Sequence, residues 1–442
     1  MSRAINSEHN GLRFLFEELR SIKKEFFSYF FLFIQFVYFS GLVRQFGTDE
    51  FLIFNILFSA FICVLKERIT RRGFKVILIS IIIFSVINLV PSFVFGFNIR
   101  LFAGYLGRIF LGYLIILYFN NEFYEKFENL VTILALISLP LYLIQIFYQD
   151  FFHFFDSLSN AVLSEQRSKQ TGSNIMGHKY LFVFLYNGWA TLRNSGFMWE
   201  PAAFGAMLTW AAILNILRNN FVMNSRLYIL LLTAFTTFSL GTYIYLAGIF
   251  SLLSLKNKKL TFPKLMFLLS ILILIGSQLN LVNENLEMMR AKVKAEERHR
   301  ERALTGTAEE TEISRVAAFE LNINYFLNWP FGYGLAAEDI PDAKYLGRSP
   351  NGLMKILVTW GIFGILLVVC SVVKLLKYNM DFYQNNIHWL FRLGLLFLFI
   401  IPISGNPFYN QPLLFSLIFG IWVLRPNLDY SKYSSVSERL IK

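Results

Sequence analysis

An arginine and a glutamate stand seven residues apart where a polar loop meets a long apolar stretch, in Arg193-Asn-Ser-Gly-Phe-Met-Trp-Glu200-Pro201-Ala-Ala-Phe-Gly205. Pro201 fits the first turn of a helix, where its missing N–H costs nothing. Glu200 then occupies the N-cap position, at the positive end of the helix dipole. Three roles are open for this carboxylate. It takes part in chemistry as a base or a substrate-orienting group, it forms a salt bridge that holds Arg193, or it only caps the helix.

The composition predicts an all-α polytopic membrane protein. Of the 442 residues, 55% are hydrophobic and 16% are charged, whereas a soluble protein carries about a quarter charged residues. Apolar runs of roughly 20 residues, the length that crosses a bilayer, recur throughout the chain. A transmembrane β-barrel would show short alternating segments instead. The first run is followed by many more and lacks a cleavage site, which is unlike a signal peptide.

The reactive residue types exclude several kinds of site. The two cysteines, Cys63 and Cys370, each lie inside an apolar run, which excludes a disulfide framework and a zinc ribbon. The five histidines show no metal-ligand spacing, and no nucleotide-binding glycine motif is present. We therefore expect no metal and no cofactor. The net charge of +12 is explained by basic cytoplasmic turns, so we expect no nucleic-acid partner.

The apolar runs predict about 12 transmembrane helices within a single membrane domain, 1–442. They cover approximately 26–43, 51–65, 76–95, 101–119, 130–149, 201–217, 227–240, 242–255, 263–282, 351–373, 388–403 and 413–424. The two spans within 227–255 are short for full crossings, so an error of one hairpin is open there.

The basic turns predict the orientation of these spans. With the N-terminus in the cytoplasm, every basic turn lies inside, as the positive-inside rule requires. These segments are 66–75, 218–226, 256–259, 374–377 and the C-terminal tail. Both termini are then cytoplasmic, and the two long loops, 150–196 and 283–350, lie outside.

Two arginines are expected near the outer face. Arg100 opens the span 101–119, and Arg108 lies about two helical turns further in. An arginine inside an apolar helix costs roughly 3 kcal/mol or more, so it needs a partner or a water-filled cavity. Arg108 therefore forms an ion pair with another span, reaches up to the interface, or lines a cavity for an anionic substrate.

A turn of small polar residues lies at the same level. Ser239, Thr242 and Tyr243 supply hydroxyl groups between the predicted spans 227–240 and 242–255. Small polar residues at a hairpin usually serve the turn itself, so this feature alone is weak.

The second long loop carries a more specific pattern. Its first part, 287–302, is rich in charges of both signs and is typical of a solvated helix face. Segment 312–329 predicts an amphipathic helix, because apolar residues recur at spacings of three and four. Arg315 and Asn322 flank this apolar stripe. Pro330-Phe-Gly-Tyr-Gly334 follows, and the segment from Arg348 to Asn351 leads into the next span, 351–373.

These segments resemble the O-antigen polymerase and ligase superfamily over roughly residues 190–365. The second-loop part of the resemblance consists of Arg315, Pro330-Phe-Gly-Tyr-Gly334, Ser349-Pro-Asn351 and Trp360-Gly-Ile-Phe-Gly364. The segment from Arg193 to Gly205 is similar to the preceding region of Wzy-like polymerases, and Ser239-Leu-Gly-Thr242 to a small-residue turn between the two. Each motif alone is loose, but their order, spacing and sidedness are together specific.

The resemblance implies a GT-C-type membrane glycosyltransferase that needs no metal and no nucleotide sugar. Such an enzyme transfers a growing polyprenyl-diphosphate-linked glycan onto the next lipid-linked oligosaccharide repeat, at the outer face of the inner membrane, in surface polysaccharide or O-antigen biosynthesis. The ligase branch carries a histidine where this chain has Pro350, which favours a polymerase. Chain length can depend on a partner co-polymerase, although no interaction motif indicates one here.

The residue types suit this chemistry. Arginines can hold the negative charge that develops on a leaving diphosphate, and a sugar hydroxyl benefits from a base within hydrogen-bond reach. We assign catalytic roles to Glu200, Arg193 and Arg315. We assign substrate binding to Arg100, Arg108, Arg348, Ser239, Thr242, Tyr243, Asn322 and Asn351.

Two other functions are open. One is a glycan ligase that uses a different acceptor. The other is a transporter or flippase of lipid-linked saccharide, which should place polar residues near the bilayer midplane rather than at one face.

Overall fold

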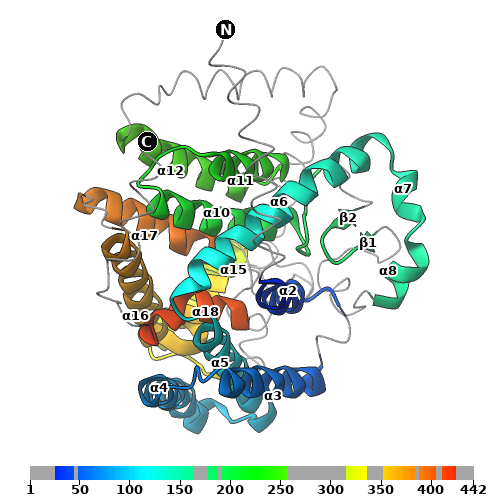
Figure 1. Cartoon of the computed structure of the whole chain (residues 1–442). Helices are drawn as coiled ribbons and strands as arrows, with labels where there is room; N and C mark the ends of the chain where they lie inside the picture. The colour runs from blue at the N-terminus through cyan, green and yellow to red at the C-terminus, as the bar shows by residue number, and fades with distance from the viewer. Residues whose placement is uncertain are drawn as a thin grey trace.

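A computed structural model describes residues 25–43, 48–162, 178–187, 192–256, 315–335, 352–383, 388–404 and 411–424. Within these ranges the chain is mostly helical, as Figure 1 shows. The longer helices are α2 (Phe26–Ser40), α3 (Asp49–Leu65), α4 (Arg71–Phe95), α5 (Ile99–Phe119), α6 (Phe123–Phe147), α10 (Pro201–Arg218), α11 (Ser225–Thr236), α12 (Leu240–Lys256), α15 (Arg315–Asn328), α16 (Gly352–Phe382), α17 (Trp389–Ser404) and α18 (Pro412–Phe419). The predicted helical class is confirmed, while the span predicted at 263–282 lies outside the described residues.

Four stretches of the described chain are long and apolar enough to cross a membrane: Gly73–Phe95, Ile99–Phe147, Pro201–Arg218 and Gly352–Asp381. The second of these holds both α5 and α6, joined by the short helix η2 (Asn120–Glu122). Five shorter helices are also apolar: Phe26–Ser40, Ser225–Thr236, Leu240–Lys256, Trp389–Ser404 and Pro412–Trp422. These helices support a membrane protein, and the number of twelve spans and the GT-C fold stay predictions.

Helix α10 lies at the centre of the described chain and packs against α6, α11, α12, α16 and α17 (Figure 1). Its first turns are rich in alanine and glycine, which lets neighbouring helices approach closely in a membrane. At Gly205 the approach is so close that a Cβ atom would overlap with the Thr242 side chain on α12. Further along, the Trp210 indole donates a hydrogen bond of 2.9 Å to the carbonyl oxygen of Phe399 on α17.

We expect Gly205→Ala to destabilise the protein by about 1–3 kcal/mol, because the added methyl group overpacks the contact with Thr242. The measurement is the thermal unfolding midpoint in detergent. Gly104→Ala on α5 is the matched control, since nothing lies within 4 Å of a Cβ added there. Truncating Thr242 to alanine in the Gly205→Ala background should recover part of the loss, and no recovery would contradict this account.

Helices α3 and α4 form a periphery around α5. Helix α5 packs against α3, α4 and α18. Helix α4, in contrast, leaves much of its apolar surface uncovered, because only 22% of its most apolar stretch is buried inside the protein. Ile79, Ile82 and Val86 are examples of large apolar side chains exposed on α4. An apolar surface of this kind fits a lipid-facing position.

The first long loop contains short elements that the sequence pattern did not predict. They are α7 (Asp150–His153), α8 (Asp156–Val162) and an antiparallel hairpin of β1 (His178–Tyr180) and β2 (Leu185–Asn187), in which Lys179 pairs with Tyr186. The Lys179 ammonium lies 2.5 Å from Asp156, and this hydrogen bond holds the pKa of the carboxyl below its usual range. The hairpin is therefore fastened to α8.

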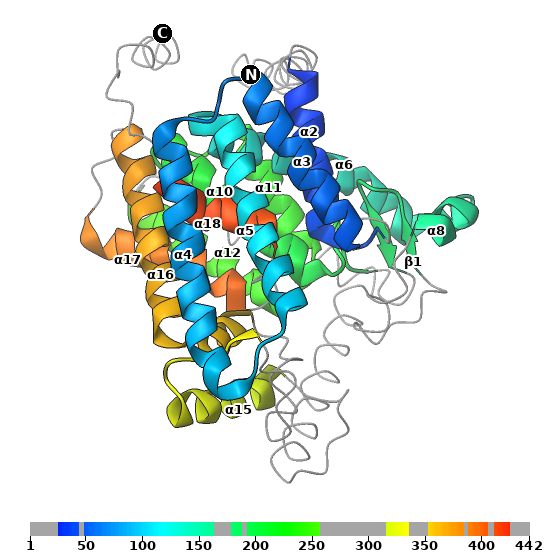
Figure 2. The same cartoon turned by 90° about the horizontal axis from the view of Figure 1, so that it is seen from below.

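Helix α15 lies crosswise at the Phe95 end of α4, as Figure 2 shows. The Phe95 ring contacts Trp329, just after α15, edge to face with ring centroids 5.5 Å apart. Helix α15 also packs along α16. The predicted amphipathic segment 312–329 thus contains a helix that is docked on the membrane helices.

Candidate functional site

The segment from Leu192 to Glu200 is held against one face of α6. Tyr142 donates a hydrogen bond of 2.9 Å to the carbonyl oxygen of Leu192, and Gln145 donates one of 3.1 Å to that of Arg193. Ser138, one turn before Tyr142, accepts a bond of 3.2 Å from the Asn194 side chain. Residues spaced by three and four lie on one face of a helix, so α6 presents a row of polar groups to this loop.

Asn194 is the residue that ties the loop together. Its fully buried side chain donates to Thr236 Oγ1 at 2.9 Å and accepts from the backbone amide of Gly196 at 2.9 Å. The backbone N–H of Asn194 donates to the backbone carbonyl oxygen of Thr236 at 3.0 Å. The loop is therefore bound both to α6 and to the end of α11.

Gly196 allows the chain to turn toward α10. Its φ of +51° lies in the left-handed region that glycine adopts without strain, and a side chain here would meet the Phe204 ring. Phe197 and Met198, which follow, are fully buried. The backbone that leads to Glu200 is thus fixed by packing as well as by hydrogen bonds.

Glu200 is the N-cap residue of α10, and Pro201 is in the first turn, as the sequence predicts. The Glu200 side chain is partly exposed and makes no capping hydrogen bond. The side chain therefore does not hold the helix end through a capping hydrogen bond, and the role of the carboxylate stays a prediction. The neighbouring Met198 and Phe204 are fully buried.

Arg193 reaches the turn between α11 and α12. Its Nε donates a hydrogen bond of 3.4 Å to the carbonyl oxygen of Thr237, and its guanidinium interacts electrostatically with the Tyr243 hydroxyl. That hydroxyl donates to the carbonyl oxygen of Phe235 at 3.3 Å. The structure thus brings Arg193 and Tyr243, predicted from separate parts of the sequence, into one neighbourhood.

The other hydroxyls of this turn are buried. Ser239 is 4% exposed, and Thr242 is fully buried against Gly205 of α10. Thr242 Oγ1 has no hydrogen-bond partner within the described part of the chain. Because Gly205 lies one turn into α10, this contact sets the distance between the α11–α12 turn and the start of α10, directly after Glu200.

The two arginines of α5 differ in their surroundings. Arg100 is exposed and forms an ion pair of 2.8 Å with Asp49 at the start of α3. Arg108 is half-buried, and no hydrogen bond or ion pair joins it to any described residue. The predicted role of Arg108 in binding an anionic substrate stays a prediction.

The predicted second-loop residues are covered unevenly by the structure. Arg315 is the first residue of α15, and Asn322, on the same helix, is 2% exposed. Arg348 and Asn351 lie outside the described residues, so their roles stay predictions.

The Pro330–Gly334 segment is inserted into helix α16. At Gly361 the helix is broken, with φ +63° and ψ −156°. The Tyr333 amide donates to the carbonyl oxygen of Val358 at 2.8 Å, and the Ile362 amide donates to that of Pro330 at 2.9 Å. The predicted span 351–373 is consequently a longer, discontinuous helix that ends at Phe382.

One comparison with known proteins finds a match. Residues 227–369 match the family model described as Wzy_C, O-Antigen ligase. This match supports the resemblance to the O-antigen polymerase and ligase superfamily. No curated protein and no solved structure matches the chain.

The match to the O-antigen polymerase and ligase superfamily covers α11, α12, α15 and the first half of α16. It takes in seven predicted site residues: Ser239, Thr242, Tyr243, Arg315, Asn322, Arg348 and Asn351. Arg100, Arg108, Arg193 and Glu200 precede it. The predicted catalytic carboxylate therefore lies outside the family match and is joined to it through the contacts of Asn194, Arg193 and Gly205.

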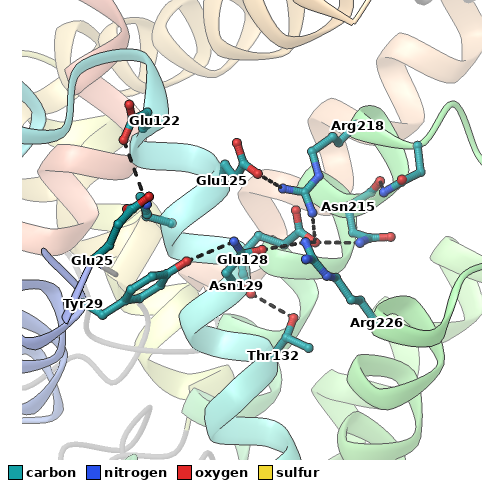
Figure 3. Close-up of polar contacts among 12 residues, drawn as sticks. Glu25, Tyr29, Glu122, Glu125, Glu128, Asn129, Thr132, Asn215, Arg218 and Arg226 are labelled. Carbon is teal, nitrogen blue, oxygen red and sulfur yellow. Dashed lines mark hydrogen bonds and ion pairs between the residues drawn. The ribbon is translucent and has the colours of Figure 1, made fainter. Parts of the chain in front are cut away.

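Sequence reasoning missed a buried cluster of charges at the other end of α10 (Figure 3). Glu128 on α6 is 1% exposed and accepts hydrogen bonds from Asn215 at 2.6 Å and Arg218 at 3.1 Å. Arg226 at the start of α11 lies 3.9 Å from the same carboxylate, and Glu125 lies 3.1 Å from Arg218. We call these five residues the Glu128 cluster.

The Glu128 cluster continues toward α2. Arg226 donates to Asn129 at 2.6 Å, and Asn129 donates to the Tyr29 hydroxyl at 3.1 Å (Figure 3). Lys126 forms an ion pair with Glu25. The sequence shows these residues only as two short charged turns, and nothing in their spacing indicates that the turns meet. Among the described residues, no group of histidine, cysteine and acidic side chains could hold a metal ion.

Proposed function

We propose that the protein is a polysaccharide repeat-unit polymerase of the O-antigen polymerase and ligase superfamily. It transfers a growing polyprenyl-diphosphate-linked glycan onto the next lipid-linked repeat, with inversion and without a metal. The bond between the anomeric carbon and the diphosphate oxygen breaks. A new bond forms from the anomeric carbon to a hydroxyl of the acceptor sugar, and that hydroxyl loses its proton.

The observation that carries this proposal is the fixed Arg193–Glu200 loop at the mouth of α10, beside a region of the superfamily. A preorganised guanidinium can stabilise the charge that develops on the diphosphate, in a site of low dielectric. A carboxylate that makes no capping hydrogen bond can accept the proton that the acceptor hydroxyl loses, or it can orient that hydroxyl. Arg108, half-buried and without a described partner, supplies a second cation for the diphosphate.

The proposed location is the inner membrane of a bacterium, with cytoplasmic termini and the Glu200 end of α10 facing outward. The basic turns of the sequence support this orientation. In it, the Glu128 cluster lies near the cytoplasmic face, where Arg218 and Arg226 conform to the same rule. The substrate is a lipid-linked oligosaccharide within the bilayer, and a co-polymerase remains a proposed partner for control of chain length.

The test is an assay of the purified protein in lipid nanodiscs, with lipid-linked repeat as the only substrate and no ion gradient. A polymerase produces a ladder of longer lipid-linked glycans. If no product lengthens, the proposal is wrong, and saccharide accumulation inside proteoliposomes would instead indicate transport.

A ligase is the second candidate, because the matching family model is described as O-Antigen ligase. Pro350 stands where the resemblance places a histidine in ligases, which favours the polymerase. Supplying a lipid A core acceptor separates the two functions. A ligase forms product only when this acceptor is present, whereas a polymerase extends the repeat without it.

We expect Arg193→Ala to lower the rate of chain extension by roughly 10²–10³-fold, the usual loss when one donor to a developing oxyanion is removed. Arg193→Lys should recover only part of the rate, because an ammonium lacks the planar fork of the guanidinium. Arg68→Ala, at an exposed position in a basic turn, is the control and should extend normally. Equal rates of chain extension for Arg193→Ala and Arg68→Ala would mean that Arg193 takes no part in the reaction.

A further inference from the structure

We propose that Gly332 and Gly361 form a positioning joint that fixes α15, and with it Arg315, relative to the membrane helix α16. This inference rests on the proposed function, because it concerns a residue assigned to the diphosphate. Neither glycine is assigned to substrate, so both act through the helix that they hold.

The joint replaces hydrogen bonds that the broken helix loses. In an unbroken helix, the Ile362 amide would donate to the carbonyl oxygen of Val358. Here Ile362 donates to Pro330 and Val358 accepts from Tyr333, so both groups are satisfied by the inserted segment. An unsatisfied backbone group in a membrane costs several kcal/mol. The Pro330–Gly334 segment therefore completes the hydrogen bonding of α16. It cannot dissociate from α16 without leaving the Ile362 amide and the Val358 carbonyl unsatisfied.

The two glycines make this insertion sterically possible. Gly332 has φ +89° and Gly361 has φ +63°, both in the region that favours glycine. A Cβ on Gly332 would lie 2.6 Å from the Gly361 nitrogen and 2.6 Å from the Thr359 oxygen. A Cβ on Gly361 would overlap with the Pro330 carbonyl. The two backbones touch at these positions, so a side chain on either one must displace the other.

Aromatic contacts fasten the joint to three helices. The Tyr333 hydroxyl donates to the carbonyl oxygen of Tyr325 on α15 at 3.2 Å, and the Tyr333 ring contacts Phe95 of α4 at 4.7 Å. Phe331 stacks on Phe363 of α16 at 6.0 Å. The segment is thus held to α15, α16 and α4 at once.

A small rotation at the joint produces a large displacement of Arg315. Helix α15 has 14 residues, and at 1.5 Å per residue Arg315 lies about 20 Å from the joint. A rotation of about 5° at the joint would therefore move the first residue by about 2 Å. A misplacement of about 1 Å can cost a factor of about 10² in rate.

A double-mutant cycle on extension kinetics tests whether the joint acts through Arg315. We expect Gly361→Ala to lower kcat by about 10²-fold and to leave KM for the lipid-linked repeat within about threefold. In the Arg315→Ala background, Gly361→Ala should lower kcat by less than about threefold. If the two losses multiply instead, the joint does not act through Arg315 and the inference is wrong.

Tyr333→Phe is a milder variant for the same cycle, because it removes only the hydrogen bond to Tyr325. It should lower kcat severalfold in the Arg315 background and have no effect in the Arg315→Ala background. Gly104→Ala is the matched glycine control on α5 and should extend at the wild-type rate.

A distance measurement tests the joint independently of activity. Spin labels on Phe319→Cys of α15 and on the native exposed Cys370 of α16 report the relative position of the two helices. We expect one narrow distance distribution in the otherwise wild-type protein and a broad or shifted one in Gly361→Ala. An unchanged distribution would overturn the joint, even if the protein proves to have another function.

Discussion

Replacing Glu200 by glutamine is expected to abolish detectable glycan chain extension, with a loss of roughly 10²–10⁴ in rate, the range for removal of a positioned base. Glutamine keeps the size and the hydrogen-bonding reach of the side chain but can neither accept a proton nor hold a negative charge. The backbone of Glu200 is fixed by the buried residues on both sides, so the substitution leaves the fold intact. The measurement is the product ladder formed from lipid-linked repeat in nanodiscs, at equal amounts of folded protein.

The result requires a control for charge at a helix start. Glu50→Gln provides it, because Glu50 lies in the first turn of α3 at an exposed position. We expect Glu50→Gln to extend the glycan at the wild-type rate. If the Glu200→Gln protein gives wild-type chain lengths and rates, the assignment of a catalytic role to Glu200 is wrong.

A comparison of Glu200→Gln with Glu200→Asp distinguishes the two remaining chemical roles. Aspartate keeps the charge but is shorter, so a base that must reach a hydroxyl loses much of its effect. An orienting anion at the helix dipole tolerates the shortening better, because the dipole interaction persists throughout the first turn. A salt bridge that only holds Arg193 predicts that both variants fail in parallel with Arg193→Ala.

The start of α10 could be predicted from the sequence because its determinants are local. Proline at the first helical turn, the preceding glutamate and the apolar run are contiguous, and the structure places the boundary at Pro201. The apolar runs that became α5, α6 and α17 are equally local, since span length and composition suffice to identify them. The positions of Arg193 and Tyr243 in one neighbourhood followed from placing both turns at one face.

The break in α16 could not be predicted because its cause lies elsewhere in the chain. Trp360-Gly361 within an apolar run is compatible with a straight membrane helix that tolerates one glycine. Only the Pro330–Gly334 segment, which supplies replacement hydrogen bonds, makes the left-handed conformation of Gly361 stable. The resemblance to a family identified both motifs, but it gave no reason to place them in contact.

The Glu128 cluster escaped prediction for a related reason. Short charged turns between membrane spans are normally solvated, so the segments around Glu128 and Arg218 indicate surface. Their burial results from the packing of α6, α10 and α11 against one another, which brings two turns separated by 90 residues together.

Replacing Glu128 by alanine is expected to destabilise the protein by about 3–5 kcal/mol, because it leaves two arginines buried without their shared partner. The side chain of Arg218 is 15% exposed and that of Arg226 is 21% exposed, so water cannot replace the lost carboxylate fully. Asn215 also loses its acceptor, since its amide donates to Glu128 at 2.6 Å. The measurement is the midpoint of thermal unfolding in detergent.

Glu122→Ala is the matched control for this prediction. Glu122 lies at the end of η2, directly before α6, but its side chain is 59% exposed and stands 4.0 Å from Lys126, so its removal should cost less than about 1 kcal/mol. Equal shifts for the two variants would mean that Glu128 contributes no more than a surface ion pair.

The distance between the Glu128 cluster and Glu200 adds a second criterion. Glu200 and Asn215 are 15 residues apart on α10, about 22 Å along the helix axis. The Glu128→Ala protein that remains folded should therefore extend glycan normally, whereas Glu200→Gln should keep the wild-type midpoint and lose extension.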